Sequence, residues 1–313
     1  MVAPARRPNA RPAADSSALR PATDSSALRS AVAGVRGVLL DLDGVLVLKG
    51  RAIDGAADAL DRIDRRGLPF AVLTNTSLVS RATLARQGEK LGLHIPPGRI
   101  VSALSSSAAW TARTFPGEPL FVVTSDDARS EFAGQRLLSP EEADAPGARA
   151  AAVVIGDSPD GLTYGNMNRA FRLVRQGATL VGMHRNPWWI TPTGPTLDSG
   201  AYVAGLEYAT GRTATIVGKP SAGIFRAAID IVRGDLGHRV ARRDLLMVGD
   251  DIRSDVLAAR RIGLRGVLVL TGKHSVDDLA EATERRRPSS RTASAPVVDG
   301  VAASLSALVA ALD

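Results

Sequence analysis

The chain has 313 residues, of which 45% are hydrophobic, so it can form one large domain or two modest ones. It contains no cysteine, which excludes disulfides and thiolate metal sites. The formal net charge is +7, but residues 1–36 carry +4 and residues 284–292 carry +3, so the rest is neutral. A folded basic face for specific nucleic-acid binding is therefore not indicated.

Both ends of the chain contain segments of biased composition. Residues 1–33 are rich in Ala, Pro, Ser and Arg and hold a tandem repeat, 12–20 and 21–29, which predicts a flexible tail. Residues 284–298 read as a basic linker. No apolar run approaches the ~20 residues that span a bilayer, and no secretory signal is present. We therefore expect a cytoplasmic protein without a membrane partner.

Apolar runs that alternate with amphipathic stretches predict an α/β fold with a parallel sheet. The predicted strands are 38–40, 70–73, 120–123, 152–155, 179–182, 213–217, 245–248 and 264–270. The predicted helices are 55–66, 80–91, 166–176, 222–233 and 301–312.

The predicted elements divide into two units. Residues 34–104 and 205–313 form a discontinuous core, and residues 105–204 form an inserted α/β unit. Its predicted strands do not end in an acidic pair, so we expect this unit to shape a pocket. The adjacent Trp188 and Trp189 either line that pocket or pack in the interior.

The segment Gly37–Leu46 carries the strongest functional signal. Its apolar run Val38–Leu40 is typical of a buried parallel strand. Asp41 and Asp43 come at the carboxyl end of that strand, and parallel sheets bind ligands at the carboxyl ends of their strands. Side chains alternate along a strand, so both carboxylates can lie on one side. Two carboxylates held this close favour a bound cation or a shared proton. An ordinary Asp-Gly turn is the alternative.

Polar residues follow four of the predicted strands. In chain order they are Asp41 and Asp43, Thr74 and Asn75, Lys219, and Asp250 with Asp251 and Asp255. Carboxylates without His or Cys suit Mg²⁺, and a lysine with hydroxyl and amide groups suits phosphoryl oxygens. Each motif alone is also explained by a helix cap, a surface turn or helix-dipole acids. Their order and spacing together indicate phosphoryl transfer to an aspartate.

The chain resembles the haloacid-dehalogenase-like hydrolases, in the NagD-like branch (subfamily IIA) that carries a large C2-type cap. The family motifs match Asp41–Val45, Thr74–Asn75, Lys219–Pro220 and Gly249–Asp255, within a similarity that covers residues 36–283. Two cap-side stretches, 164–168 and 206–221, are similar to phospholysine phosphohistidine inorganic pyrophosphate phosphatase and haloacid-dehalogenase-like hydrolase domain-containing protein 2. The resemblance implies a Rossmann-like, doubly wound core with an inserted cap.

The resemblance also implies a role for each matched residue. Asp41 is the nucleophile, and Asp43 is the general acid and base. The implied Mg²⁺ ligands are the Asp41 carboxylate, the Asp43 backbone carbonyl and Asp250. Thr74, Asn75 and Lys219 are the implied phosphate contacts, and Asp251 and Asp255 are implied to orient Lys219 or metal-bound waters. The candidate substrate contacts from the cap are Arg129, His184 and Trp188. A purely structural role for His184 is the alternative.

Three other functions stay open at this point. The first is hydrolysis of phosphohistidine, phospholysine or inorganic pyrophosphate. The two similar animal proteins carry Ser where this chain has Asp43, and Asp43 favours ordinary hydrolysis of a small phosphomonoester. The second is a receiver-like, phospho-accepting signalling module, which also uses clustered Asp, Thr and Lys-Pro. The third is a non-catalytic scaffold. The oligomeric state is open too, with a homodimer as one option.

Overall fold

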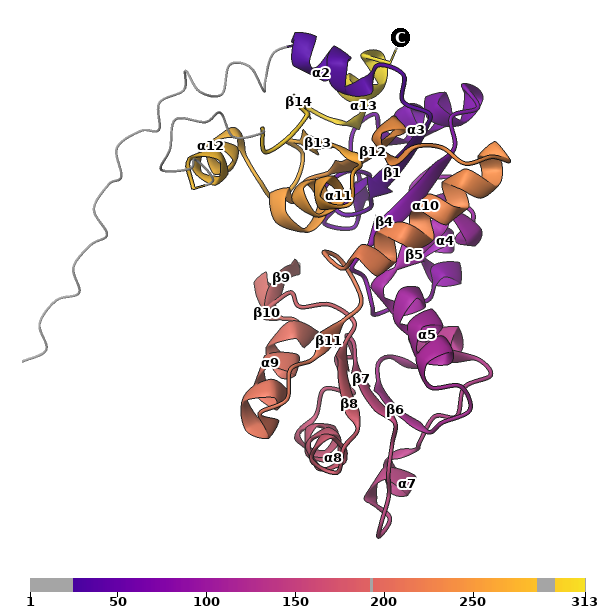
Figure 1. Cartoon of the computed structure of the whole chain (residues 1–313), viewed down its shortest axis with the longest axis vertical. Helices are drawn as coiled ribbons and strands as arrows, with labels where there is room; N and C mark the ends of the chain where they lie inside the picture. The colour runs from indigo at the N-terminus through magenta and orange to yellow at the C-terminus, as the bar shows by residue number, and fades with distance from the viewer. Residues whose placement is uncertain (1–24, 192–193, 286–295, 313) are drawn as a thin grey trace, which may run out of the picture.

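The computed structural model describes residues 25–191, 194–285 and 296–312 and consists of two α/β units (Figure 1). The upper unit in that view is built around a six-stranded sheet, and the lower unit around a four-stranded sheet. The lower unit is a single continuous segment inserted into the upper one. Within the described residues, no helix is both long and apolar enough to cross a membrane.

The six-stranded sheet is parallel throughout. Its strands are β1 Gly37–Asp41, β4 Phe70–Thr74, β5 Ile100–Ser102, β12 Leu245–Gly249, β13 Arg265–Val269 and β14 Gly300–Ala302. They lie in the order β14-β13-β12-β1-β4-β5, so the chain progresses in opposite directions from β1 and from β12. Open α/β sheets bind ligands at such a reversal, outside the carboxyl ends of the strands. The predicted doubly wound parallel sheet is confirmed.

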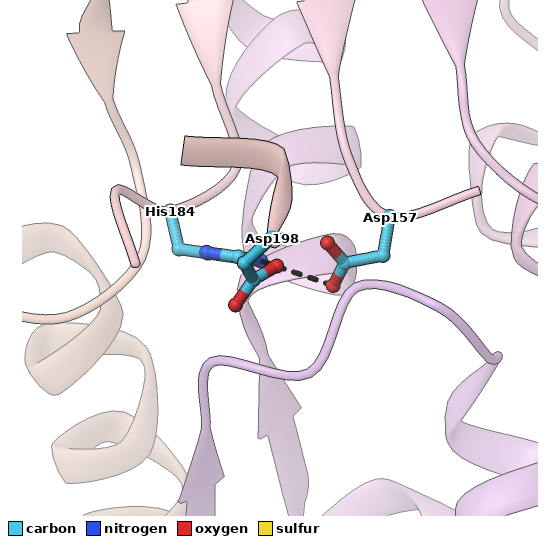
Figure 2. A group of neighbouring side chains, drawn as sticks. All are labelled: Asp157, His184 and Asp198. Carbon is cyan, nitrogen blue, oxygen red and sulfur yellow. Dashed lines mark hydrogen bonds and ion pairs between the residues drawn. The ribbon is translucent and has the colours of Figure 1, made fainter. Parts of the chain in front are cut away.

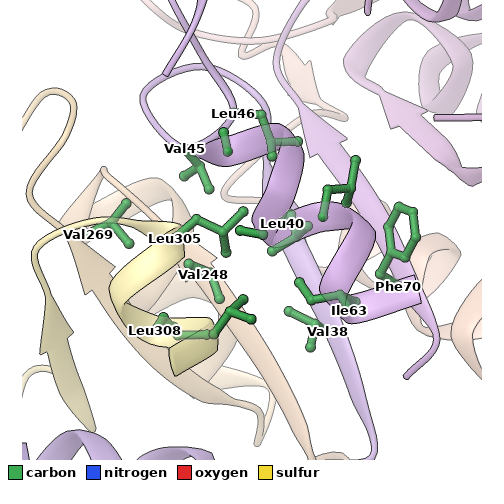
Figure 3. Packing of buried hydrophobic residues seen from close by; sticks show 14 of the residues in the cluster. Val38, Leu40, Val45, Leu46, Ile63, Phe70, Val248, Val269, Leu305 and Leu308 are labelled. Carbon is green, nitrogen blue, oxygen red and sulfur yellow. The ribbon is translucent and has the colours of Figure 1, made fainter. Parts of the chain in front are cut away.

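Helices cover both faces of this sheet. They are α2 Ser25–Val32, α3 Ala56–Arg65, α4 Arg81–Lys90, α10 Ala222–Leu236, α11 Ala258–Arg261, α12 Val276–Glu284 and α13 Leu305–Ala310. Val38 and Leu40 pack against α2, α3 and α13, whereas Leu39 between them packs against α10 and α11. Figure 3 shows the first of these faces. Successive side chains of a strand point to opposite faces of the sheet, and helices cover both faces here. Every residue of the strand is therefore buried, which explains its continuous apolar run.

The four-stranded sheet has its own core. Its strands are β6 Leu120–Val123, β7 Ala152–Ile155, β8 Thr179–Gly182 and β11 Thr215–Ile216, all parallel in the order β11-β8-β7-β6. Helices α8 Tyr164–Arg175 and α9 Ser199–Thr210 cover one face, and α5 Ala103–Thr114 covers the other. The smaller elements are α6 Asp126–Arg129, α7 Pro140–Asp144, the hairpin of β9 Trp188–Thr191 and β10 Gly194–Leu197, and the hairpin of β2 Val47–Leu48 and β3 Arg51–Ala52.

The border between the two units differs from the sequence prediction. Residues 213–217 were expected in the core sheet, but β11 pairs with β8 in the four-stranded sheet. Helix α9, which crosses the predicted border at residue 204, packs Val203 and Leu206 into the core of the inserted unit. The inserted unit therefore extends to about residue 217, because a two-residue strand carries too little sequence signal to choose its sheet.

Both terminal predictions also need correction. A flexible tail was predicted for residues 1–33, of which residues 1–24 lie outside the described residues. The rest of that segment contains helix α2, whose Leu28, Ala31 and Val32 are buried against the sheet. The linker prediction for 284–298 falls mostly outside the described residues, yet Val297 and Val298 are buried. The predicted helix 301–312 begins as strand β14, and only Leu305–Ala310 is helical.

Candidate active site

Four segments bring carboxylates and one lysine together at the carboxyl edge of the larger sheet. Asp41 is the last residue of β1, and Asp250 directly follows β12. Asp255 lies one helical turn later, in η5 Ile252–Leu257. Lys219 comes from the segment between β11 and α10. These side chains, separated by up to about two hundred positions in the sequence, meet beside the reversal between β1 and β12.

Lys219 forms the centre of this group. Its Nζ lies 2.7 Å from Asp41 Oδ1 and 2.7 Å from Asp255 Oδ1, and all three side chains are buried. Burial alone would lower the pKa of Lys219, but the two carboxylates raise it above its usual value. Lys219 is therefore a fixed positive charge at this edge of the sheet.

The carboxylates still outnumber the lysine. Asp41, Asp250 and Asp255 each offer an oxygen atom within 4.8 Å of the others. Burial raises the pKa of Asp41 well above its usual range, and repulsion by Asp255 adds to this while Lys219 opposes it. Burial and then Asp255 raise the pKa of Asp250 to about 6. Such a group is stabilised by protons or by a hard divalent cation, so the donor set fits Mg²⁺.

Two glycines leave room for the Asp250 carboxylate. A Cβ atom on Gly44 would lie 2.1 Å from Asp250 Oδ2, and one on Gly272 would lie 2.0 Å from the same atom. Gly44 also has φ +79°, a backbone conformation that other residues resist. The Lys273 backbone N–H donates to Asp250 Oδ2 at 2.7 Å. These contacts hold Asp250 in one orientation towards Asp41.

Asp43 and Thr74 lie next to this group. The Thr74 hydroxyl hydrogen-bonds the Asp43 carboxyl and, together with Lys219, lowers its pKa. Desolvation by the surrounding protein atoms outweighs both and raises the pKa of Asp43, although its side chain remains accessible to solvent. A raised pKa at a solvent-accessible carboxyl is suited to giving and taking protons.

The structure gives Asn75 a contact that was not predicted, with the backbone of Lys219. Its Oδ1 accepts from the Lys219 backbone N–H at 2.8 Å, and its Nδ2 donates to the Lys219 backbone carbonyl at 3.2 Å. Both ends of the carboxamide are thus used to fix the backbone of the lysine. Asn75 therefore positions Lys219, and its expected contact with phosphate stays a prediction.

The two supporting acids, Asp251 and Asp255, pair with different lysines in the structure. Asp255 contacts Lys219, as predicted, but Asp251 pairs with Lys273 at 2.6 Å. The Asp251 carboxylate also accepts from the backbone N–H groups of Arg253 and Ser254, which begin η5. Sequence reasoning missed Lys273. Its signal was the rarity of lysine in this chain and its place just after a predicted strand.

The contacts of Asp251 predict an acid-sensitive contribution to stability. Burial would raise its pKa, but the hydrogen bond from Lys273 and the backbone N–H groups lower it to about 2. The stabilisation is therefore present above the usual pKa of 3.8 and lost as pH falls towards 2. We expect about 1–2 kcal/mol, because Lys273 is largely solvent-exposed.

Urea unfolding at pH 6 and at pH 3 measures this contribution. The wild type should lose more of its unfolding free energy between these pH values than Asp251→Asn does. Asp54→Asn, which removes an exposed carboxylate, should behave like the wild type. An identical pH dependence in Asp251→Asn and the wild type would contradict the role given to the Lys273 pair.

The three predicted cap residues do not form one group. The Arg129 guanidinium donates to the Val122 carbonyl within the inserted unit, and the Trp188 side chain is 56% exposed on the β9–β10 hairpin. His184 is buried, with Asp157 and Asp198 beside it (Figure 2). Among the contacts of the described residues, none joins Arg129, His184 or Trp188 to Asp41.

Two segments of the sequence match models of one hydrolase family, and the first of them extends into the inserted unit. Residues 38–137 match the description "Haloacid dehalogenase-like hydrolase", and residues 216–302 match a related haloacid-dehalogenase hydrolase description. Human haloacid dehalogenase-like hydrolase domain-containing protein 2 is 32% identical over 80% of this chain and 89% of its own length. Bovine phospholysine phosphohistidine inorganic pyrophosphate phosphatase is 34% identical over 81% of this chain and 94% of its own length.

Solved structures resemble the whole arrangement of core and insert. The p-nitrophenyl phosphatase from Archaeoglobus fulgidus has a TM-score of 0.75 and 27% identity, covering 88% of this chain and 99% of its own. NagD from Escherichia coli K-12 has a TM-score of 0.71 and 26% identity, covering 87% and 97%. The expected resemblance to the NagD-like branch is confirmed.

Proposed function

Because this chain belongs to the haloacid-dehalogenase-like hydrolases and is a phosphoric monoester hydrolase of that family, we propose that it hydrolyses a small phosphorylated metabolite through an Mg²⁺-dependent aspartyl-phosphate mechanism. One observation carries the proposal: buried Asp41 lies 2.7 Å from Lys219 Nζ, with Asp250 beside it, at the reversal of the sheet. A carboxylate next to fixed positive charge can approach an anionic phosphoryl group. Candidate substrates are sugar phosphates, nucleotides and similar monoesters.

In the proposed reaction, an Asp41 oxygen attacks phosphorus as the bond to the leaving oxygen breaks. Asp43 gives its proton to that leaving oxygen. It then takes a proton from the water that attacks the aspartyl phosphate, which releases inorganic phosphate and restores Asp41. The raised pKa of Asp43 supports this double role, because a proton must be both held and released near neutral pH. Lys219 and Thr74 bind the transferring phosphoryl oxygens.

The proposed metal ligands are the carboxylates of Asp41 and Asp250 and the backbone carbonyl of Asp43. Three observations support them: the buried oxygens lie within 4.8 Å of one another, burial raises the pKa of both carboxyls, and two glycines make room around Asp250. When bound, Mg²⁺ would offset the repulsion between a carboxylate nucleophile and a phosphate.

Gly272→Ala tests the metal site without replacing a proposed ligand. The new Cβ would lie 2.0 Å from Asp250 Oδ2, so the carboxylate must move. We expect Mg²⁺ affinity, measured by isothermal titration calorimetry, to fall about tenfold or more. Gly234→Ala in α10 is the matched control, since its Cβ meets no atom within 4 Å. Equal affinity in both variants would argue against Asp250 as a ligand.

A second candidate function is hydrolysis of P–N or P–O–P bonds. The observation that favours this second function is the bovine relative, which is named for phospholysine, phosphohistidine and inorganic pyrophosphate and is 34% identical to this chain. Asp43 argues for the monoester, because an alkoxide leaving group needs a proton more than an imidazole or a phosphate does. The receiver-like and scaffold alternatives are set aside, because the family is one of hydrolases.

Release of inorganic phosphate from a substrate panel tests the proposal. The panel contains p-nitrophenyl phosphate, a sugar phosphate, a nucleotide, imidodiphosphate and pyrophosphate, each with Mg²⁺ and with chelator. We expect Mg²⁺-dependent release that is fastest from the monoesters. Faster release from imidodiphosphate or pyrophosphate would select the second candidate, and no release from any compound would refute both. Cytoplasmic location, a homodimer, and the lack of nucleic-acid and membrane partners stay predictions.

A further inference from the structure

The loop between β4 and α4, which begins with Asn75, is bound to the inserted unit. The Ser77 hydroxyl donates to Asp157 Oδ2 at 2.7 Å and accepts from the Asp157 backbone N–H at 2.9 Å. Thr124 Oγ1 donates to the Ser77 carbonyl at 3.2 Å, and the Ser125 hydroxyl donates to the Leu78 carbonyl. This loop directly follows Thr74, so one short segment contacts both the candidate active site and the insert.

Asp157 is the partly buried centre of a hydrogen-bond network in the insert (Figure 2). His184 Nε2 lies 3.0 Å from Asp157 Oδ2, and the Ser199 backbone N–H donates to Asp157 Oδ1 at 3.3 Å. Asp198 hydrogen-bonds the same carboxyl. Burial raises the pKa of Asp198, and the bond to Asp157 raises it further, to about 7, so Asp198 can supply a proton to the Asp157 carboxylate.

The position of the ring proton on His184 decides between two roles for this group, hydrogen bonding and metal binding. Asp157, His184 and Asp198 offer donor atoms within 4.8 Å of one another, as a metal site would. The Asn186 backbone N–H donates to His184 Nδ1 at 3.3 Å, however, and this contact assigns the ring proton to Nε2. A metal at Nε2 would place the ring proton on Nδ1, against the Asn186 N–H, whereas Nε2–H is well placed to donate to Asp157.

We propose that His184 is a positioning residue, which acts through Asp157 and Ser77 to hold the Thr74–Asn75 segment in the orientation that binds the phosphoryl group. This inference rests on the function proposed above. His184 is 1% exposed and Ser77 is fully buried, so water has little access to their sides of the network, although the Asp157 side chain is 24% exposed. Asn75 extends the connection to the backbone of Lys219. A displacement of about 1 Å at a reacting group can cost about 100-fold in rate.

His184→Leu and His184→Gln test the proposal as a pair. Leucine removes the Nε2–H donor, whereas the glutamine amide can still donate to Asp157. We expect kcat/KM for p-nitrophenyl phosphate to fall about 10- to 100-fold in the leucine variant, mainly through kcat, and to recover most of that loss in the glutamine variant. His94→Leu, an exposed histidine of the core, is the control and should match the wild type.

Hydrogen exchange gives a readout that does not depend on turnover. Amides of residues 74–81 should exchange at least several-fold faster in His184→Leu than in the wild type or in His184→Gln. Ser77→Ala is a smaller change and should give the same local increase in exchange. It takes the place of His184→Leu in this experiment if the leucine variant does not fold. Unchanged exchange and unchanged kcat/KM in these variants would overturn the inference. A wild type that hydrolyses no substrate would refute the proposed function, and the exchange data would still decide the positioning role.

Discussion

Lys219→Met is expected to lower the free energy of unfolding by about 3–5 kcal/mol at neutral pH in the absence of metal. The reason is that Asp41 and Asp255 both lie 2.7 Å from the ammonium group and are buried with it. Methionine fills a similar volume but leaves two carboxylates without a positive partner. Urea unfolding monitored by circular dichroism measures the loss.

The deficit should shrink at acid pH. Burial raises the pKa of Asp41, and the pKa should rise further once the lysine is gone, so protonation removes the uncompensated charge as pH falls. Lys273→Met is the matched control, because the Lys273 side chain is 62% exposed and its ammonium group pairs with the carboxylate of Asp251. We expect a cost of about 1 kcal/mol or less there. Equal losses in the two variants would show that the buried ion pairs do not stabilise the fold.

Asp41→Asn is expected to lower kcat by about 10⁴-fold or more, because an amide cannot attack phosphorus to form the acyl phosphate. The fold should persist, since the amide has nearly the shape of the carboxylate and Lys219 keeps its contact with Asp255. Phosphate release with saturating Mg²⁺, together with urea unfolding, separates lost chemistry from lost stability.

Asp251→Asn is the comparison for that variant. Asp251 lies at the same edge of the sheet, but its carboxylate contacts Lys273 and the start of η5, away from Lys219. We expect its kcat to stay within about tenfold of the wild type. An Asp41→Asn enzyme with more than about 1% of wild-type kcat would point to a nucleophile other than Asp41.

The sequence was most informative where one strand carried both a buried apolar run and a polar end. The runs that precede Asp41, Thr74 and Asp250 became β1, β4 and β12, which are neighbours in the sheet. Because parallel strands present their carboxyl ends on one edge, correct strands were enough to bring the motifs together. The contact of Asp255 with Lys219 was implied by the family resemblance alone, because the strand that precedes Lys219 belongs to the other sheet.

Pairings between distant residues could not be predicted from one sequence. His184 was recognised only as a lone histidine, because its partners Asp157 and Asp198 lie 27 and 14 positions away and follow no common motif. Asn75 was assigned to phosphate because a free amide suits phosphate oxygens. Only the structure shows that the backbone of Lys219 uses both of its hydrogen-bonding groups.

The pairing of β1 with β12 has a consequence for synthesis on the ribosome. Gly37 lies beside Leu245, so the first core strand emerges long before its neighbour, about 10–40 s earlier at common elongation rates. The four-stranded unit between them is continuous and can begin to fold during that interval. Asp41, however, has neither its lysine partner nor a complete sheet around it until Lys219 and Asp255 have emerged. Binding by a chaperone during translation is therefore expected to concentrate on the exposed apolar strands β1 and β4.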